Sequence, residues 1–284
     1  MVLGFRAFQG KHTRRVISHG LIFIILLICW EGASNFGLLD EYLYPKPSGI
    51  LNSFWVIYIK NASIWHHLWV TIGLVLLGFI GGSIAGISLG SLVGFNPTMR
   101  RFLQPYIIVI EATPRIAVAP LLIAALGFGI QSKVAIIILV CFFAPFINTL
   151  SGVINVGNDK LELFKSLGAT KTQILVKLVF PEALPTIMAG ERLAMTAALS
   201  GALVAEFIQR DQGLGSLILL YSRNLNMSSA FACIFTLTVL GFFIFKGMEI
   251  LDRRIAFWTY EAGRIKRSNK KARKTLNLLG VGHG

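Results

Sequence analysis

Charged residues are scarce in this chain. Asp, Glu, Lys and Arg make up 14% of its 284 residues, whereas a soluble domain carries roughly 25%. Hydrophobic residues reach 55%, and the mean hydropathy is +0.70. This composition excludes an ordinary soluble domain. The length leaves room for one membrane domain with short tails, but not for a second, soluble domain.

Cysteine and histidine are few, and none is placed for metal binding or acid–base chemistry. Cys29, Cys141 and Cys233 lie in apolar runs without CxxC spacing, so we expect small buried hydrophobic side chains rather than disulfides or metal ligands. The five histidines show no H-E-x-x-H spacing, and none lies deep in an apolar run. The chain also lacks GxxxxGK followed by Ser or Thr, the loop that holds nucleotide phosphates. We therefore expect no enzyme, no bound cofactor and no metal here.

Basic residues outnumber acidic ones by 27 to 13, which gives a net charge of +14. Such a charge is typical either of a nucleic-acid-binding protein or of a membrane protein with basic cytoplasmic loops. The basic run 264–274 has no aromatic residues between its charges. It therefore favours contact with anionic lipid headgroups over stacking with nucleic acid. We expect a lipid bilayer, and no nucleic acid, as the partner of this run.

Six apolar runs are long enough to cross a bilayer, which requires about 20 predominantly apolar residues. The first follows basic residues, as a signal peptide would, but no clean cleavage site follows it, so we expect a retained helix. The six runs are Val16–Phe36, Leu68–Gly94, Phe102–Leu126, Val134–Ile154, Ala183–Phe207 and Phe231–Leu251.

Lysine and arginine are unevenly distributed among the segments that join these runs. Most precede the first run, stand at Arg100 and Arg101, lie within residues 155–182, or follow residue 252. Because the cytoplasmic side of a membrane protein carries the excess of Lys and Arg, both termini are predicted in the cytoplasm. The sequence thus predicts an all-α integral membrane protein with six transmembrane helices.

The segment between the first two runs contains Pro45 and Pro47, which exclude a helix up to Pro47. The residues after Pro47 predict a short amphipathic helix at the outer interface of the membrane. We expect three tryptophans to serve as its aromatic anchors, namely Trp55, Trp65 and Trp69.

The second of these runs carries a row of glycines at a spacing of four residues. Small residues in such a row allow two membrane helices to approach closely. We expect this face to pack against another core helix or against a partner subunit. The row consists of Gly78, Gly82, Gly86 and Gly90.

The third and fifth spans carry charges at membrane depth, where each costs about 2.5–3.5 kcal/mol on insertion scales. Glu111 and Arg115 are four residues apart, which would place them on one helical face, and nearby prolines predict a kinked or broken helix. The pair either faces a translocation path or forms a buried ion pair that fixes helix packing. Glu206, near the outer end of the fifth helix, either lines a gate or has a structural role. Glu191 and Arg192 are expected to pair with a neighbouring helix.

The segment from Asn155 to Pro185 is too polar to span a membrane and too long for a plain connector. Asp159 is predicted to cap a first short helix, with Glu162 in the capping-box position. Gly168 is predicted to end that helix in a left-handed conformation.

A second short helix is predicted from Thr170, which would cap it together with Gln173. Pro181 and Pro185 are placed at the start of the fifth transmembrane helix. The segment is thus predicted as two short helices joined at a glycine corner. Such a pair favours docking to a soluble partner, with an ordinary connecting loop as the alternative.

This segment resembles the EAA loop of binding-protein-dependent ABC importer permeases. That motif reads E-A-A, three residues, G, nine residues, then I-x-L-P, and Glu162, Gly168 and Pro181 match it in type and spacing. Leu163 and Phe164 stand in place of its two alanines. Three further stretches resemble the nitrate, sulfonate, taurine and vitamin-precursor branch of the family: Thr113–Leu122, Gly127-Phe-Gly129 with Ser132-Lys133, and Ala205-Glu206 with Gly213-Leu-Gly215.

The resemblance implies a type I, MetI-like permease fold in a bacterial inner membrane, crossed several times. The chain would then divide into a cytoplasmic tail (1–15), a first transmembrane helix (16–36), a periplasmic segment (37–67), a core of five helices (68–252) with the coupling loop (155–182), and a basic cytoplasmic tail (253–284). The coupling residues would be Glu162, Lys165, Ser166, Leu167, Gly168, Ala169, Thr170 and Pro181.

The resemblance also implies the partners. They would be two copies of an ABC ATP-binding subunit, which uses the ATP, a second permease copy in a homodimer, and an extracytoplasmic solute-binding protein. The solute would be a nitrate-, sulfonate- or taurine-like anion, or a vitamin such as a thiamine-precursor pyrimidine. An ATP-independent secondary carrier or channel is the alternative, although carriers often show internal repeats and none is visible here.

Overall fold

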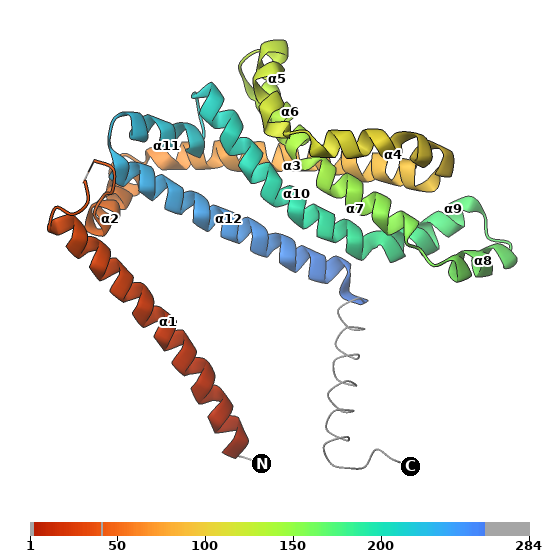
Figure 1. The fold of residues 1–284 in the computed structure, drawn as a ribbon, viewed down its shortest axis with the longest axis horizontal. Helices are drawn as coiled ribbons and strands as arrows, with labels where there is room; N and C mark the ends of the chain where they lie inside the picture. Colours follow the sequence, from red (N-terminus) through yellow and green to blue (C-terminus); the bar gives the residue numbers. More distant parts are fainter. Residues whose placement is uncertain (1–2, 41, 259–284) are drawn as a thin grey trace. The chain divides into compact units, whose positions relative to one another are not determined.

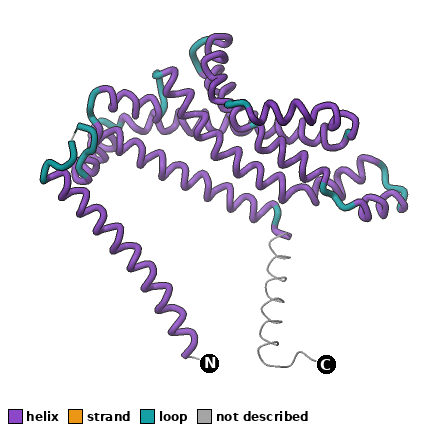
Figure 2. The backbone as a smooth tube through the Cα atoms, viewed as in Figure 1, coloured by secondary structure: helices purple, strands orange, loops and turns teal. Residues whose placement is uncertain are grey.

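The computed structural model describes residues 3–40 and 42–258, and all regular elements within them are helical (Figure 2). In chain order they are α1 (Leu3–Asn35), α2 (Pro47–Trp55), the π-helical turn η1 (Val56–Lys60), α3 (Ser63–Phe95), α4 (Pro97–Ala112), the 3-10 turn η2 (Arg115–Val118), α5 (Ala119–Leu126), α6 (Ile130–Cys141), α7 (Phe143–Ile154), α8 (Asn158–Ser166), α9 (Lys171–Ile174), the π-helical turn η3 (Leu175–Val179), α10 (Phe180–Gln209), α11 (Leu214–Arg223) and α12 (Met227–Ile255). The basic run 264–274 lies outside the described residues.

Five helical stretches are long and apolar enough to cross a membrane, and a sixth span results if the bent pair α4 and η2–α5 counts as one. The all-helical class is therefore confirmed, and the six predicted runs correspond to the five stretches and the bent pair. The five stretches are Ile17–Asn35, Ser63–Phe95, Ile130–Ile154, Lys171–Gln209 and Met227–Ile255.

The described residues form two compact units, one containing those up to Val70 with Arg210–Thr238, the other Thr71–Gln209 with those from Val239 to Trp258. In the first unit, α2 begins at Pro47 as predicted, because a proline at the first helical position gives up an N–H that would be unpaired anyway. The carboxylate of Glu31 accepts hydrogen bonds from the Ser48 N–H at 3.1 Å and its hydroxyl at 2.8 Å, which fastens α2 to α1.

The predicted anchors Trp55, Trp65 and Trp69 are all exposed, at 62%, 47% and 66% of their surface. Trp65 also donates its indole N–H to the backbone oxygen of Tyr58 at 3.2 Å. Their contact with a membrane interface stays a prediction.

In the second unit, α6 and α7 are separated only at Phe142, and α10 packs along both of them (Figure 1). The glycine face of α3 packs against the same pair, as predicted for another core helix. A methyl group added at Gly86 would lie 2.7 Å from the backbone oxygen of Phe142, and one at Gly90 would lie 2.6 Å from that of Phe146. Gly94 continues the row against Val153.

Polar side chains add contacts between the helices of this unit. The Ser83 hydroxyl of α3 donates to a carboxylate oxygen of Glu191 at 2.6 Å, and Arg192 forms an ion pair with Asp252 of α12. The predicted pairing of both residues with neighbouring helices is confirmed.

The prediction that all three cysteines are buried is wrong for one of them. Cys141 and Cys233 are buried, but Cys29 is exposed on α1. Only 6% of the first span is buried within this chain, so an apolar residue there faces outward by default.

We expect Gly86→Ala to lower the free energy of unfolding by about 1–3 kcal/mol, because the added methyl group would press on rigid backbone. Gly73→Ala in the same helix is the matched control, since nothing lies within 4 Å of its added methyl group. Alanine there should be neutral or stabilising by about 0.5–1 kcal/mol. Thermal unfolding of the full-length chain in detergent micelles measures the stability of both variants. An equal loss of stability in the two variants would contradict the close approach of α3 to α6 and α7.

Candidate functional site

Helix α8 starts earlier than the sequence suggested. The carbonyl of Gly157 accepts the first helical hydrogen bond, from the Leu161 N–H at 3.2 Å, so Gly157 is the N-cap and no side chain caps the helix. The prediction of Asp159 as N-cap, with Glu162 completing a capping box, is therefore wrong. Asp159 lies in the first turn instead, where a carboxylate still interacts favourably with the helix dipole.

The end of α8 follows the prediction. Gly168 has a φ of +73°, in the left-handed region. The Gly168 N–H donates to the oxygen of Lys165 and the Ala169 N–H to that of Phe164, both at 3.0 Å. These two bonds form a Schellman motif, which satisfies carbonyls that the helix end leaves free.

The helix after this corner begins with the predicted capping box. Thr170 accepts from the Gln173 N–H at 3.3 Å, and the Gln173 side chain accepts from the Thr170 N–H at 2.8 Å. The prediction that this helix is short and separate from the fifth span is wrong, because Lys171–Gln209 is continuous.

Proline does not break this helix, because a π-helical turn precedes it. The Phe180 N–H donates to the oxygen of Leu175, five residues back. That wider turn accommodates the ring of Pro181, which cannot donate a hydrogen bond itself. Pro185 likewise lies inside α10.

The two arms around Gly168 pack against each other and against α7. Leu161, Phe164 and Ile174 contact a buried cluster of apolar residues, and Lys160 donates to Glu182 of α10 at 2.6 Å. Figure 1 shows α8 and α9 at the common end of α7 and α10. The cluster consists of Val153, Val156, Leu178, Val179, Ala183 and Ile187. We call residues 155–182 the elbow.

The opposite face of the elbow is uncovered. Leu163 and Leu167 expose 57% and 76% of their surface at its tip. Exposed leucines on an otherwise polar tip favour contact with another protein. Of the predicted coupling residues, six are exposed (Glu162, Lys165, Ser166, Leu167, Gly168 and Thr170), while Ala169 and Pro181 are half-buried.

The third span is broken, as its prolines predicted. Helix α4 ends at Ala112, and the segment after it turns by 83° (Figure 1). Because the break falls between Glu111 and Arg115, the prediction that they share one helical face is wrong. Glu111 is exposed, whereas the Arg115 guanidinium lies 4.5 Å from the ring centre of Phe143 on α7.

Glu206 is fully enclosed in the second unit, where its carboxylate accepts from the Thr71 hydroxyl of α3 at 2.8 Å. One turn further along α10, Gln209 donates to the Ser132 hydroxyl at 2.8 Å and accepts from the Gly129 N–H at 2.9 Å. Lys133 is also buried, with 2% of its surface exposed. Its place at the start of an apolar run gave no sign of this, because a lysine there is typical of a membrane surface.

Residues 82–257 match the family described as the binding-protein-dependent transport system inner membrane component. The chain is 29% identical to the formylaminopyrimidine transport permease protein ThiX of Halalkalibacterium halodurans, over 87% of this chain and 98% of that protein. It is 28% identical to the taurine transport system permease protein TauC of Escherichia coli, over 82% and 86% of the two chains. The putative aliphatic sulfonates transport permease protein SsuC of Bacillus subtilis is 29% identical, over 82% and 84%.

Solved structures share the fold. An inward-facing structure of the methionine ABC transporter MetNI has a chain that matches with a TM-score of 0.61 at 16% identity, over 68% of this chain and 98% of that one. An amino acid ABC transporter crystallised with histidines matches with a TM-score of 0.57 at 16% identity, over 72% and 97%. The family match covers more than half of the sequence, and the relatives are transport permeases rather than enzymes. This chain therefore belongs to the family of binding-protein-dependent transport system inner membrane components, the permease subunits of ABC importers.

Proposed function

We propose that this chain forms half of the membrane pathway of an ABC importer, as one of two identical permease copies. Two ATP-binding subunits would dock on the elbows and hydrolyse ATP. A solute-binding protein would deliver the solute on the opposite side. The observation that carries the proposal is the elbow itself, with a packed inner face, an exposed leucine tip and a glycine-closed corner.

Both arms of the elbow are connected to α10, so a displacement of the elbow would be transmitted to that helix. Its second arm continues without interruption into α10, and its first arm is held to α10 by the Lys160–Glu182 ion pair. An ATP-binding subunit that displaces the tip would therefore move α10, together with α6 and α7 packed along it. In this mechanism Leu163, Leu167 and Gly168 contact the partner.

The uneven distribution of Lys and Arg supports an elbow and termini in the cytoplasm, and the named relatives are bacterial, which supports a bacterial inner membrane. Glu111 and Arg115 beside the broken helix are the candidates for lining the path. Glu206 is enclosed, which supports a structural role between α3 and α10 over a gate.

The solute is proposed to be a small anion of the sulfonate, taurine or nitrate kind, or an aromatic vitamin precursor. Relatives are named for the transport of a formylaminopyrimidine, taurine and aliphatic sulfonates. Arg115 supports an anionic group on the solute.

The docking proposal predicts that a cysteine at the elbow tip crosslinks to the cognate ATP-binding subunit. Leu167→Cys, in a Cys29→Ser background because Cys29 is exposed, should give a crosslinked product in membranes that contain both subunits. Phe128→Cys is the matched control, since Phe128 is equally exposed, at 78%, in the turn between α5 and α6. A crosslink from Phe128→Cys and none from Leu167→Cys would overturn the docking site.

A second prediction concerns the corner. Gly168→Ala should weaken binding of the ATP-binding subunit about five- to thirtyfold, because an L-residue held at positive φ costs roughly 1–2 kcal/mol, and the free elbow will relax out of the docking shape. Gly157→Ala is the control, since Gly157 has a φ of −60° and nothing lies within 4 Å of the added methyl group. Titration of the purified ATP-binding subunit onto the permease in nanodiscs measures both affinities. Equal affinities would show that the corner plays no part in docking.

A further inference from the structure

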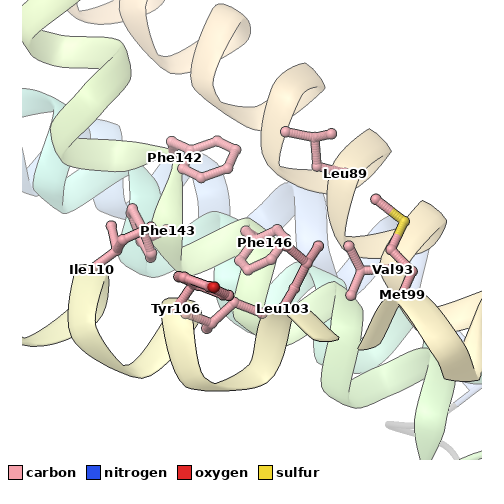
Figure 3. Close-up of a pocket in the computed structure, with 10 residues that line it drawn as sticks. Leu89, Val93, Met99, Leu103, Tyr106, Ile110, Phe142, Phe143 and Phe146 are labelled. Carbon is pink, nitrogen blue, oxygen red and sulfur yellow. The ribbon is translucent and has the colours of Figure 1, made fainter. Parts of the chain in front are cut away.

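A cavity of about 200 Å³ opens in the second unit between α3, α4 and α7. In Figure 3, phenylalanines of the α6–α7 pair face Tyr106 and Leu103 of α4, and Leu89 and Val93 of α3 close another side. We call this cavity the aromatic pocket. Its main walls are Leu89, Leu103, Tyr106, Phe142, Phe143 and Phe146.

The three phenylalanines form one packed group. The rings of Phe142 and Phe146 are stacked, with centres 5.4 Å apart and planes inclined by 20°. Phe143 meets Phe142 edge-on at 5.1 Å. The three rings lie on one side of the α6–α7 pair, because Phe146 comes four residues after Phe142 and three after Phe143, the spacings that bring side chains together on a helix. The pocket therefore offers flat aromatic surfaces, which suit another ring.

A positive charge lies next to the pocket, on Arg115, which contacts a lining residue but does not line the pocket itself. The Arg115 guanidinium lies over Phe143, 4.5 Å from the ring centre. Within the described residues the structure gives Arg115 no carboxylate partner. A guanidinium stacked on a ring keeps its N–H groups at the edge, where they can donate to a planar anionic group. Arg115 is thus placed to hold an anion beside an apolar, aromatic space.

We propose that the aromatic pocket and Arg115 form a solute subsite for a small aromatic anion, such as an arylsulfonate. The ring would lie among the phenylalanines and Tyr106, and the sulfonate would bind Arg115. This inference rests on the proposed function, because it needs the pocket to meet the solute path. The pocket volume of about 200 Å³ is sufficient for one aromatic ring, since an apolar cavity of about 150 Å³ binds benzene.

A lipid acyl chain fits this arrangement less well. Its headgroup would have to lie at Arg115 to use the charge, yet Arg115 follows a helix of 16 residues, roughly 24 Å from where that helix begins. The basic pair Arg100–Arg101 near the start of α4 is the position that a headgroup would occupy. Taurine fits less well also, because it has no ring and carries an ammonium group.

The test is equilibrium binding of radiolabelled 4-toluenesulfonate to the assembled importer in nanodiscs. Unlabelled taurine and neutral benzyl alcohol are the competitors. Arg115→Gln should weaken toluenesulfonate binding at least tenfold and leave competition by benzyl alcohol unchanged. Tyr106→Leu should weaken the binding of both toluenesulfonate and benzyl alcohol severalfold. Because Tyr106 is 55% exposed, this variant should fold normally. Taurine should compete at least tenfold less well than unlabelled toluenesulfonate.

Arg210→Gln and Phe242→Leu are the matched controls, because both residues are exposed and neither lines the pocket. Both should bind toluenesulfonate like the unmodified protein. The proposal is overturned if Arg115→Gln binds normally, or if taurine competes as well as toluenesulfonate. If toluenesulfonate binding fails these tests while Leu167→Cys still crosslinks to the ATP-binding subunit, the subsite is wrong and the importer role stands. If the crosslink is lost, the result counts against docking of the ATP-binding subunit and not against the solute subsite.

Discussion

Helix α3 can lie backbone to backbone against α6 and α7 only because glycine recurs at every fourth position along one of its faces, from Gly78 to Gly94. Between helices in lipid there is no hydrophobic driving force, since lipid tails are as apolar as leucine, so close van der Waals packing must hold the helices together. The α6–α7 pair is approached closely from α10 as well, where Gly190 lies against Ala144 and Asn148. The result is a core of three packed spans, and both the elbow and the aromatic pocket are built on its middle member.

The elbow depends on this core at both of its ends. Its first arm follows α7, its second arm becomes α10, and the apolar cluster between the arms includes residues of both helices. Further along α10, Glu191 accepts a hydrogen bond from Ser83 of α3, and Arg192 forms an ion pair with Asp252 of α12. A force on the leucine tip therefore reaches α3, α10 and α12 through contacts that are already in place, which is what a permease driven by a separate ATP-binding subunit requires.

The break in the third span has a different consequence. In an unbroken helix Arg115 would stand one turn above Glu111, and the two charges would compensate each other. The turn of 83° separates them and brings Arg115 onto the ring of Phe143. Irregular backbone at membrane depth is tolerated where it lines a cavity or is covered by protein. The break thus converts a local charge pair into a cation beside an aromatic space.

The sequence by itself determined the six spans, the glycine face of α3, the left-handed corner at Gly168, the Thr170 cap and the broken third span. Each of these depends on residues within one or two turns, or on a periodic pattern along one helix. Only the structure decided that Gly157 is the N-cap of α8, that the next helix continues through Pro181, that Glu206 and Lys133 are enclosed, and that Arg115 lies on Phe143. The first two depend on backbone hydrogen bonds that the pattern of residue types does not show. The enclosure of Glu206 and Lys133 and the position of Arg115 arise from contacts between residues far apart in the chain, and a pattern read along one segment contains no information about which segment will lie across from it.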